Sequence, residues 1–216
     1  TNVKQVSAGL EFTFALDHRG RLYSCGCNSS TQLGQTGYYN NYFAYQARVF
    51  SFIRVPIENE VLQVSCGEYH ALILDSNRQI VGFGLQRSLP RWPNRSSNTV
   101  TIELINSGSF SSNFISTNGD LFVHPRDGLS YNILDYRSSD FSGGAKVRMP
   151  PISLICSGLG YSIAKDRDGN YWLWGNNEHG NLGTGDCYGL REPVQMDSRL
   201  NEHLNRAIIC AKSARK

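Results

Sequence analysis

Short segments in which apolar and polar residues alternate recur along this chain. Alternation with a period of two is typical of β-strands whose two faces meet different surroundings. The first segment of each group is rich in Val, Ile and Leu, and a second one with β-branched and aromatic residues follows after a glycine. The pattern predicts first strands at 3–6, 61–64, 102–105 and 152–155, second strands at 12–16, 70–74, 114–115 and 161–164, and third strands at 21–23, 79–81, 120–122 and 170–172.

The segments fall into four copies in one register when they are aligned on Gly9, Gly67, Gly108 and Gly158. Eight residues after each glycine comes a polar residue that can start a turn, and eleven residues after it comes Gly in three copies and Arg78 in the second. An Asp-x-x-Gly step suits a tight turn, because Asp caps the backbone and Gly accepts a positive φ. Arg78 therefore predicts a different turn or local strain in the second copy.

Successive repeat glycines are 58, 41 and 50 residues apart, and the segment 207–211 resembles 152–156. A unit of about 40–60 residues with about four strands has the size of a β-propeller blade. We expect an all-β propeller of four-stranded antiparallel blades at 1–58, 59–99, 100–149 and 150–205, with a further blade starting at 206–216. The last strands of the first and fourth blades are predicted at 52–56 and 192–194.

The first and fourth copies share a longer signature. It runs from Val3 through Cys25-Gly26-Cys27-Asn28 to Gln32-Leu33-Gly34, and from Leu154 through Trp174-Gly175-Asn176-Asn177 to Gly180-Asn181-Leu182-Gly183. This string resembles the repeat of the regulator-of-chromosome-condensation family. The resemblance extends over most of the chain and is weaker in the second copy and weakest in the third.

The family resemblance implies a seven-bladed propeller, of which this chain would supply four blades and the start of a fifth. It also implies three kinds of activity: nucleotide exchange on a Ran-like small GTPase, binding of histones and DNA, or scaffolding. In the exchange factors the GTPase lies against the loops that follow the repeat glycines. Exchange needs no covalent catalysis, only acidic groups that compete with phosphate for a lysine and Mg²⁺, and aromatic anchors.

Six residues in or beside these loops have the types expected of a binding surface for such a partner: Glu11, Phe12, Glu68, Tyr69, His70 and Tyr161. Two of them also have a structural interpretation. A histidine three residues after the glycine usually packs within the blade, and Glu68 could be an ordinary surface glutamate. The third and fourth copies carry no acid in these loops, which weakens the case for exchange. A non-catalytic interaction module within a larger protein or complex is the alternative.

Composition narrows the remaining options. The chain has 216 residues, is 40% hydrophobic and 18% charged, and carries a net charge of +3. That charge is too small to indicate a nucleic-acid surface by itself, so histone or DNA contact ranks below a protein partner. The arginines at 48, 54, 87, 91 and 95 fit a solvated loop or a partner contact, and the aromatic segment 38–45 fits a binding patch or a packed loop.

The sequence shows no catalytic motif, no metal-ligand spacing and no phosphate-binding glycine loop, so we expect no cofactor, metal or small-molecule substrate. No apolar stretch is long enough to span a membrane. The six cysteines lack the spacing of a disulfide framework and predict reduced thiols. We therefore expect a cytoplasmic or nuclear protein, for which targeting signals could lie outside this sequence.

Overall fold

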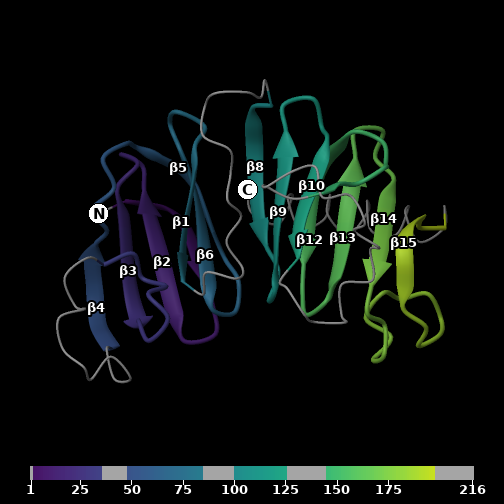
Figure 1. Cartoon of the computed structure of the whole chain (residues 1–216), viewed down its shortest axis with the longest axis horizontal. Helices are drawn as coiled ribbons and strands as arrows, with labels where there is room; N and C mark the ends of the chain where they lie inside the picture. The colour runs from purple at the N-terminus through teal and green to yellow at the C-terminus, as the bar shows by residue number, and fades with distance from the viewer. Residues whose placement is uncertain (1, 36–47, 85–99, 126–144, 198–216) are drawn as a thin grey trace.

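The fold is a row of four antiparallel β-sheets that lie side by side, from β4 at the left of Figure 1 to β15 at its right. The computed structural model describes residues 2–35, 48–84, 100–125 and 145–197. No helix occurs among these residues. The first, third and fourth sheets each have four strands, and the second has three described strands, β5-β6-β7.

The strands follow one another in the sheets as they do along the chain, so strands that are consecutive in the sequence are hydrogen-bonded neighbours within each sheet. Their bounds in chain order are β1 (Val3–Ala8), β2 (Phe12–Asp17), β3 (Leu22–Cys27), β4 (Arg48–Arg54), β5 (Val61–Cys66), β6 (His70–Asp75), β7 (Ile80–Gly84), β8 (Ile102–Ser107), β9 (Ser111–Ser116), β10 (Leu121–Pro125), β11 (Ala145–Lys146), β12 (Ile152–Ser157), β13 (Tyr161–Asp166), β14 (Tyr171–Gly175) and β15 (Leu190–Gln195).

Most of the core lies between the sheets. One cluster joins Phe14 and Leu22 of the first sheet to Val64 and Ile73 of the second. Corresponding clusters join the second sheet to the third and the third to the fourth. A further cluster lies within the fourth sheet, where Tyr171 and Leu173 pack with Leu182 and Met196. Burial of apolar residues between neighbouring sheets is the packing expected of propeller blades.

Polar side chains fix the first two seams. The amide group of Gln5 on β1 accepts a hydrogen bond from Val64 N–H (3.2 Å) and donates one to Val64 O (2.8 Å) on β5. Gln63 makes the same pair of bonds to Ile105 on β8. At the third seam Leu104 takes the place of the glutamine, and Asn113 Nδ2 instead donates to Ser157 Oγ at 2.9 Å.

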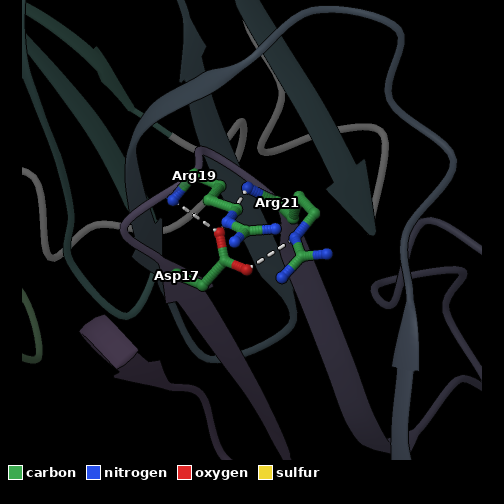
Figure 2. Close-up of polar contacts among 3 residues, drawn as sticks. All are labelled: Asp17, Arg19 and Arg21. Carbon is green, nitrogen blue, oxygen red and sulfur yellow. Dashed lines mark hydrogen bonds and ion pairs between the residues drawn. The ribbon is translucent and has the colours of Figure 1, made fainter. Parts of the chain in front are cut away.

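The predicted turns join the second and third strand of each sheet. In the first sheet Asp17 Oδ1 accepts hydrogen bonds from the backbone N–H groups of Arg19 and Arg21, each at 2.9 Å, and Asp17 Oδ2 pairs with Arg21 Nε at 2.7 Å (Figure 2). Gly20 adopts the predicted positive φ, +71°. Its carbonyl accepts from Val61 N–H (2.9 Å), so this turn also holds the start of the second sheet.

Arg78 keeps the same turn in the second sheet. Its N–H donates to Asp75 O at 2.9 Å, as Gly20 N–H does to Asp17 O. The φ of Arg78 is 60°, in the left-handed region that costs a residue with a side chain about 1 kcal/mol or more. Of the two interpretations that the sequence left open, local strain is therefore correct and a different turn is wrong.

The outer strands are longer than predicted. The first sheet ends with β4 at Arg48–Arg54, where the sequence predicted 52–56, and the fourth ends with β15 at Leu190–Gln195, where it predicted 192–194. The fold class, an all-β propeller of antiparallel blades, is confirmed. The blade boundaries stay predictions, and the aromatic segment 38–45, Arg87, Arg91, Arg95 and the fifth blade at 206–216 lie outside the described residues.

The aspartate turns make stability depend on pH. Burial alone would raise the pKa of Asp17, but hydrogen bonds from Arg21 and Arg19 outweigh it and hold this pKa below its ordinary value; the pKa of Asp166 is lowered in the same way by Trp172 and Asn170. A lowered folded-state pKa gives stability that is complete above the unfolded-state value of about 4 and is lost as the pH falls below it.

We therefore expect the urea midpoint of the wild type to decrease as the pH is lowered from about 5 to about 2. For Asp17→Asn we expect a less steep decrease over the same range. Asp168→Asn removes an exposed carboxylate from the turn of the fourth sheet, and serves as the control with an unchanged slope. Equal slopes for wild type and Asp17→Asn would contradict this role of the turn.

Candidate functional site

The loops that follow the four repeat glycines come together at one end of the row of sheets. Backbone hydrogen bonds of 3.2 Å link each loop to the next: Leu10 N–H to Glu68 O, Glu68 N–H to Ser109 O, and Ser109 N–H to Gly158 O. The loops therefore form a continuous surface, which we call the glycine-loop surface. The aspartate turns lie at the opposite end of the strands.

The repeat glycines are required by this close stacking. A Cβ on Gly9 would lie 2.7 Å from Gly67 O, one on Gly67 2.5 Å from Gly108 O, and one on Gly108 3.1 Å from Gly158 O. The side chain three residues later also lies against the glycine of its own sheet, as the His70 ring does against Gly67. No residue with a side chain fits without moving one of these neighbours.

Phe12 and His70 do not belong to the surface. Phe12 is 3% exposed and meets Phe14 edge-on, with 6.1 Å between the ring centroids. His70 is fully buried, and its Nε2 lies 3.2 Å from Ser112 Oγ of the third sheet. Both side chains fill the space beneath a repeat glycine, so the prediction that they contact a partner is corrected: they support the loops from below.

The other candidates are accessible to different degrees. Glu11 and Tyr69 are exposed, while Glu68 and Tyr161 are half-buried. The hydrogen bond between Leu10 and Glu68 places the two glutamates on adjacent loops. The Tyr161 ring lies against Gly158, in the place that Phe12 and His70 have in their sheets. Glu11, Glu68 and Tyr69 are thus the predicted residues that the structure brings together on an accessible surface.

Two apolar residues of this surface were not among the site residues predicted from the sequence. Leu10 is 59% exposed and Leu159 is 58% exposed. Both come directly after a repeat glycine, so the register was a signal that could have identified them. Beside Glu11 the surface is hollowed by a cavity of about 260 Å³, lined by Glu11, Gly26, Cys27, Arg48, Val49 and Phe50.

The accessible side chains of this surface are carboxylates and apolar groups. Among the described residues, no three His, Cys, Asp or Glu side chains come together as metal ligands. No helix in the described part of the chain is long and apolar enough to cross a membrane. Burial raises the pKa of the Cys66 thiol to about 12, so this thiol, which contacts Ser7 across the first seam, is a packing group.

Sequence models of the regulator of chromosome condensation (RCC1) repeat match residues 19–74 in one case, and residues 3–32 and 61–88 in the other. Residues 3–88 therefore carry repeats that match the RCC1 family. The matched residues lie on the first two sheets, whereas the sequence signature was most complete in the first and fourth copies.

The human protein described as probable E3 ubiquitin-protein ligase HERC6 is 25% identical over 199 residues, which cover 84% of this chain and 19% of that protein. Among solved structures, human WBSCR16 matches with a TM-score of 0.74 at 19% identity, over 90% of this chain and 53% of that one. Prp20p of Saccharomyces cerevisiae, whose binding to Gsp1p and histones has been described, matches with a TM-score of 0.68 at 19% identity. The match covers 91% of this chain and 51% of Prp20p.

These similarities establish the RCC1-like propeller fold. The chain spans about a fifth of the length of HERC6 and about half of the two solved propellers.

The stacking of the repeat glycines predicts that Gly67→Ala lowers the free energy of unfolding by about 1–3 kcal/mol, because the new Cβ overlaps the His70 ring and Gly108 O. Urea unfolding followed by tryptophan fluorescence measures the change. The control is Asn77→Ala at an exposed position, which should cost about 0.5 kcal/mol or less. If Gly67→Ala were as stable as the control, the close stacking would not constrain this position.

Proposed function

We propose that the chain is part of an RCC1-like protein-interaction propeller whose glycine-loop surface binds a small Ras-type, Ran-like GTPase and promotes nucleotide exchange on it. The observation that supports this most directly is the position of Glu11 and Glu68 on adjacent, hydrogen-bonded loops. Leu10, Tyr69 and Leu159 add exposed apolar area around these carboxylates. A surface of this kind fits a partner with a basic site rimmed by apolar groups.

The chemistry of exchange is consistent with such a surface. A small GTPase holds its nucleotide through a lysine and Mg²⁺ at the phosphates, so carboxylates that approach this site weaken the hold on the phosphates. The two glutamates need only exposure and a fixed position, and the backbone bond between their loops supplies the latter. The binding of Prp20p to Gsp1p supports the choice of partner class.

The second candidate function is an interaction module without exchange activity. It is favoured by the absence of acids in the last two glycine loops, which carry Ser109-Phe110 and Leu159-Gly160. The small share of HERC6 that the chain spans also fits a module within a larger protein. The two candidates differ in one measurable property, because only the first accelerates nucleotide release.

The test uses a panel of small GTPases, Ran among them, each loaded with a fluorescent guanine nucleotide. We expect the wild type to accelerate release from one of them, and the double variant Glu11→Ala/Glu68→Ala to lose about tenfold or more of that acceleration, since each charge-assisted contact contributes about 1.5–3 kcal/mol.

The matched control is Glu60→Ala/Asp168→Ala, which removes the same charge at the turn end and should behave like the wild type. Binding to a GTPase without faster release would favour the module without exchange activity. No binding to any GTPase, or an unchanged rate for Glu11→Ala/Glu68→Ala, would refute the proposed surface.

A further inference from the structure

A second surface lies on β4, at the outer edge of the first sheet. Among the described strands β4 pairs with β3 alone, and its register slips: Val49 lies opposite Gly26 and Ile53 opposite Ser24. Three residues, 50–52, thus face a single residue of β3. We call them the β4 tip. Such a bulge pushes the strand out of its ladder and re-aims its side chains.

The β4 tip exposes two aromatic rings. Phe50 is 92% exposed and Phe52 is 50% exposed, which makes Phe50 the most exposed large apolar side chain in the described part of the chain. Arg48 and Arg54, both exposed, flank the tip at the two ends of β4. Neither guanidinium forms an ion pair with any residue that the structure describes.

The fourth sheet has the same bulge with different side chains. In β15, Leu190 lies opposite Gly175 and Val194 opposite Leu173, so three residues again face one. These are Arg191, Glu192 and Pro193, with one positive and one negative charge. Charges and proline are the usual means by which an edge strand is kept free of partners. The first and fourth sheets therefore share the bulge, and of these two the first carries aromatic residues at its tip.

Neighbouring sheets do not cover this tip. The first sheet packs against the second, yet Phe50 stays exposed; the fourth packs against the third, yet Arg191 and Glu192 stay exposed. The position of Val6 behaves differently. Val6 is exposed in the first sheet, but Ile155, which has the same position in the fourth sheet, is buried against the third sheet. The Val6 position thus belongs to a seam between sheets, and the β4 tip lies outside the seams.

From these observations we infer that the β4 tip is a docking site for an acidic segment of a partner protein that carries an apolar side chain. Arg48 and Arg54 supply two positive charges with no acid between them, so the stripe is complementary to carboxylates. Exposed aromatic residues beside arginine are the composition typical of interface anchors. The cavity of about 260 Å³ beside Glu11 is shared by the glycine-loop surface and the β4 tip, and its lining by Arg48 and Phe50 offers room for an apolar side chain next to the tip. This inference does not rest on the GTPase proposal.

The test compares the wild type with Phe50→Arg/Ser51→Glu/Phe52→Pro, which gives β4 the tip of β15 and leaves the net charge unchanged. Because the same bulge carries these residues in the fourth sheet, the variant is expected to fold. Phe50→Ala/Phe52→Ala is a second variant that adds no charge and no proline. Arg191→Ala/Glu192→Ala, in the equivalent bulge, is the matched control.

A displayed random peptide library is selected on the immobilised wild type, with the β15-tip variant in solution as competitor. We expect the enriched peptides to combine Asp or Glu with apolar residues. Their affinity, measured by fluorescence anisotropy, should fall about tenfold or more with both tip variants and with Arg48→Glu/Arg54→Glu, and stay unchanged with the β15 control.

Several results would overturn the inference. One is that no peptide specific for the wild type is enriched, and another is that the enriched peptides are basic. A third is that the selected peptides bind the tip variants as tightly as they bind the wild type. Self-association of the wild type that Phe50→Ala/Phe52→Ala abolishes would instead make a second copy of the chain the occupant. Salt-sensitive binding of a fluorescent single-stranded oligonucleotide that requires Phe50 and Phe52 would assign the tip to nucleic acid.

Discussion

The architecture depends on the close approach of successive sheets at the repeat glycines. The carbonyl of one glycine occupies the place that a Cβ on the preceding glycine would take, from Gly9 through Gly158. This approach allows the N–H groups of Leu10, Glu68 and Ser109 each to donate a hydrogen bond to a backbone carbonyl of the next loop. It also brings the apolar faces of the sheets into contact, and burial of these faces is the main favourable term in folding. The glycines therefore set the spacing on which the core relies.

The two ends of the sheets serve different purposes. At one end, buried carboxylates such as Asp17 and Asp166 satisfy the turn backbone, and the turn carbonyls of Gly20 and Gly119 hold the next sheet. These polar groups are used within the fold. At the other end, the glycine loops satisfy one another through their backbones, so the side chains of Glu11 and Tyr69 are left accessible to a partner. This division is the basis of the proposed binding surface on the glycine loops.

The seams also differ in how they are fixed. Gln5 and Gln63 each bridge to the backbone of the next sheet with two hydrogen bonds, which sets the register of the first two seams. At the third seam Leu104 removes that bridge, and Asn113 and Arg167 make other contacts, to Ser157 and to the carbonyl of Thr117. The repeat thus tolerates different chemistry at the same position as long as the apolar packing and the glycine spacing remain.

The sequence by itself determined the repeat, its turns and its strands. Alternation and the offsets from Gly9, Gly67, Gly108 and Gly158 depend on local backbone geometry, which each segment encodes in its own residues. The tertiary structure decided which side chains are accessible. Phe12 and His70 resemble surface anchors in the sequence, but the neighbouring sheet buries them, whereas Leu10, Leu159 and Phe50 resemble core residues and are exposed. Exposure depends on which sheet packs against which face and on a slip of register in β4, and neither is a property of any single segment.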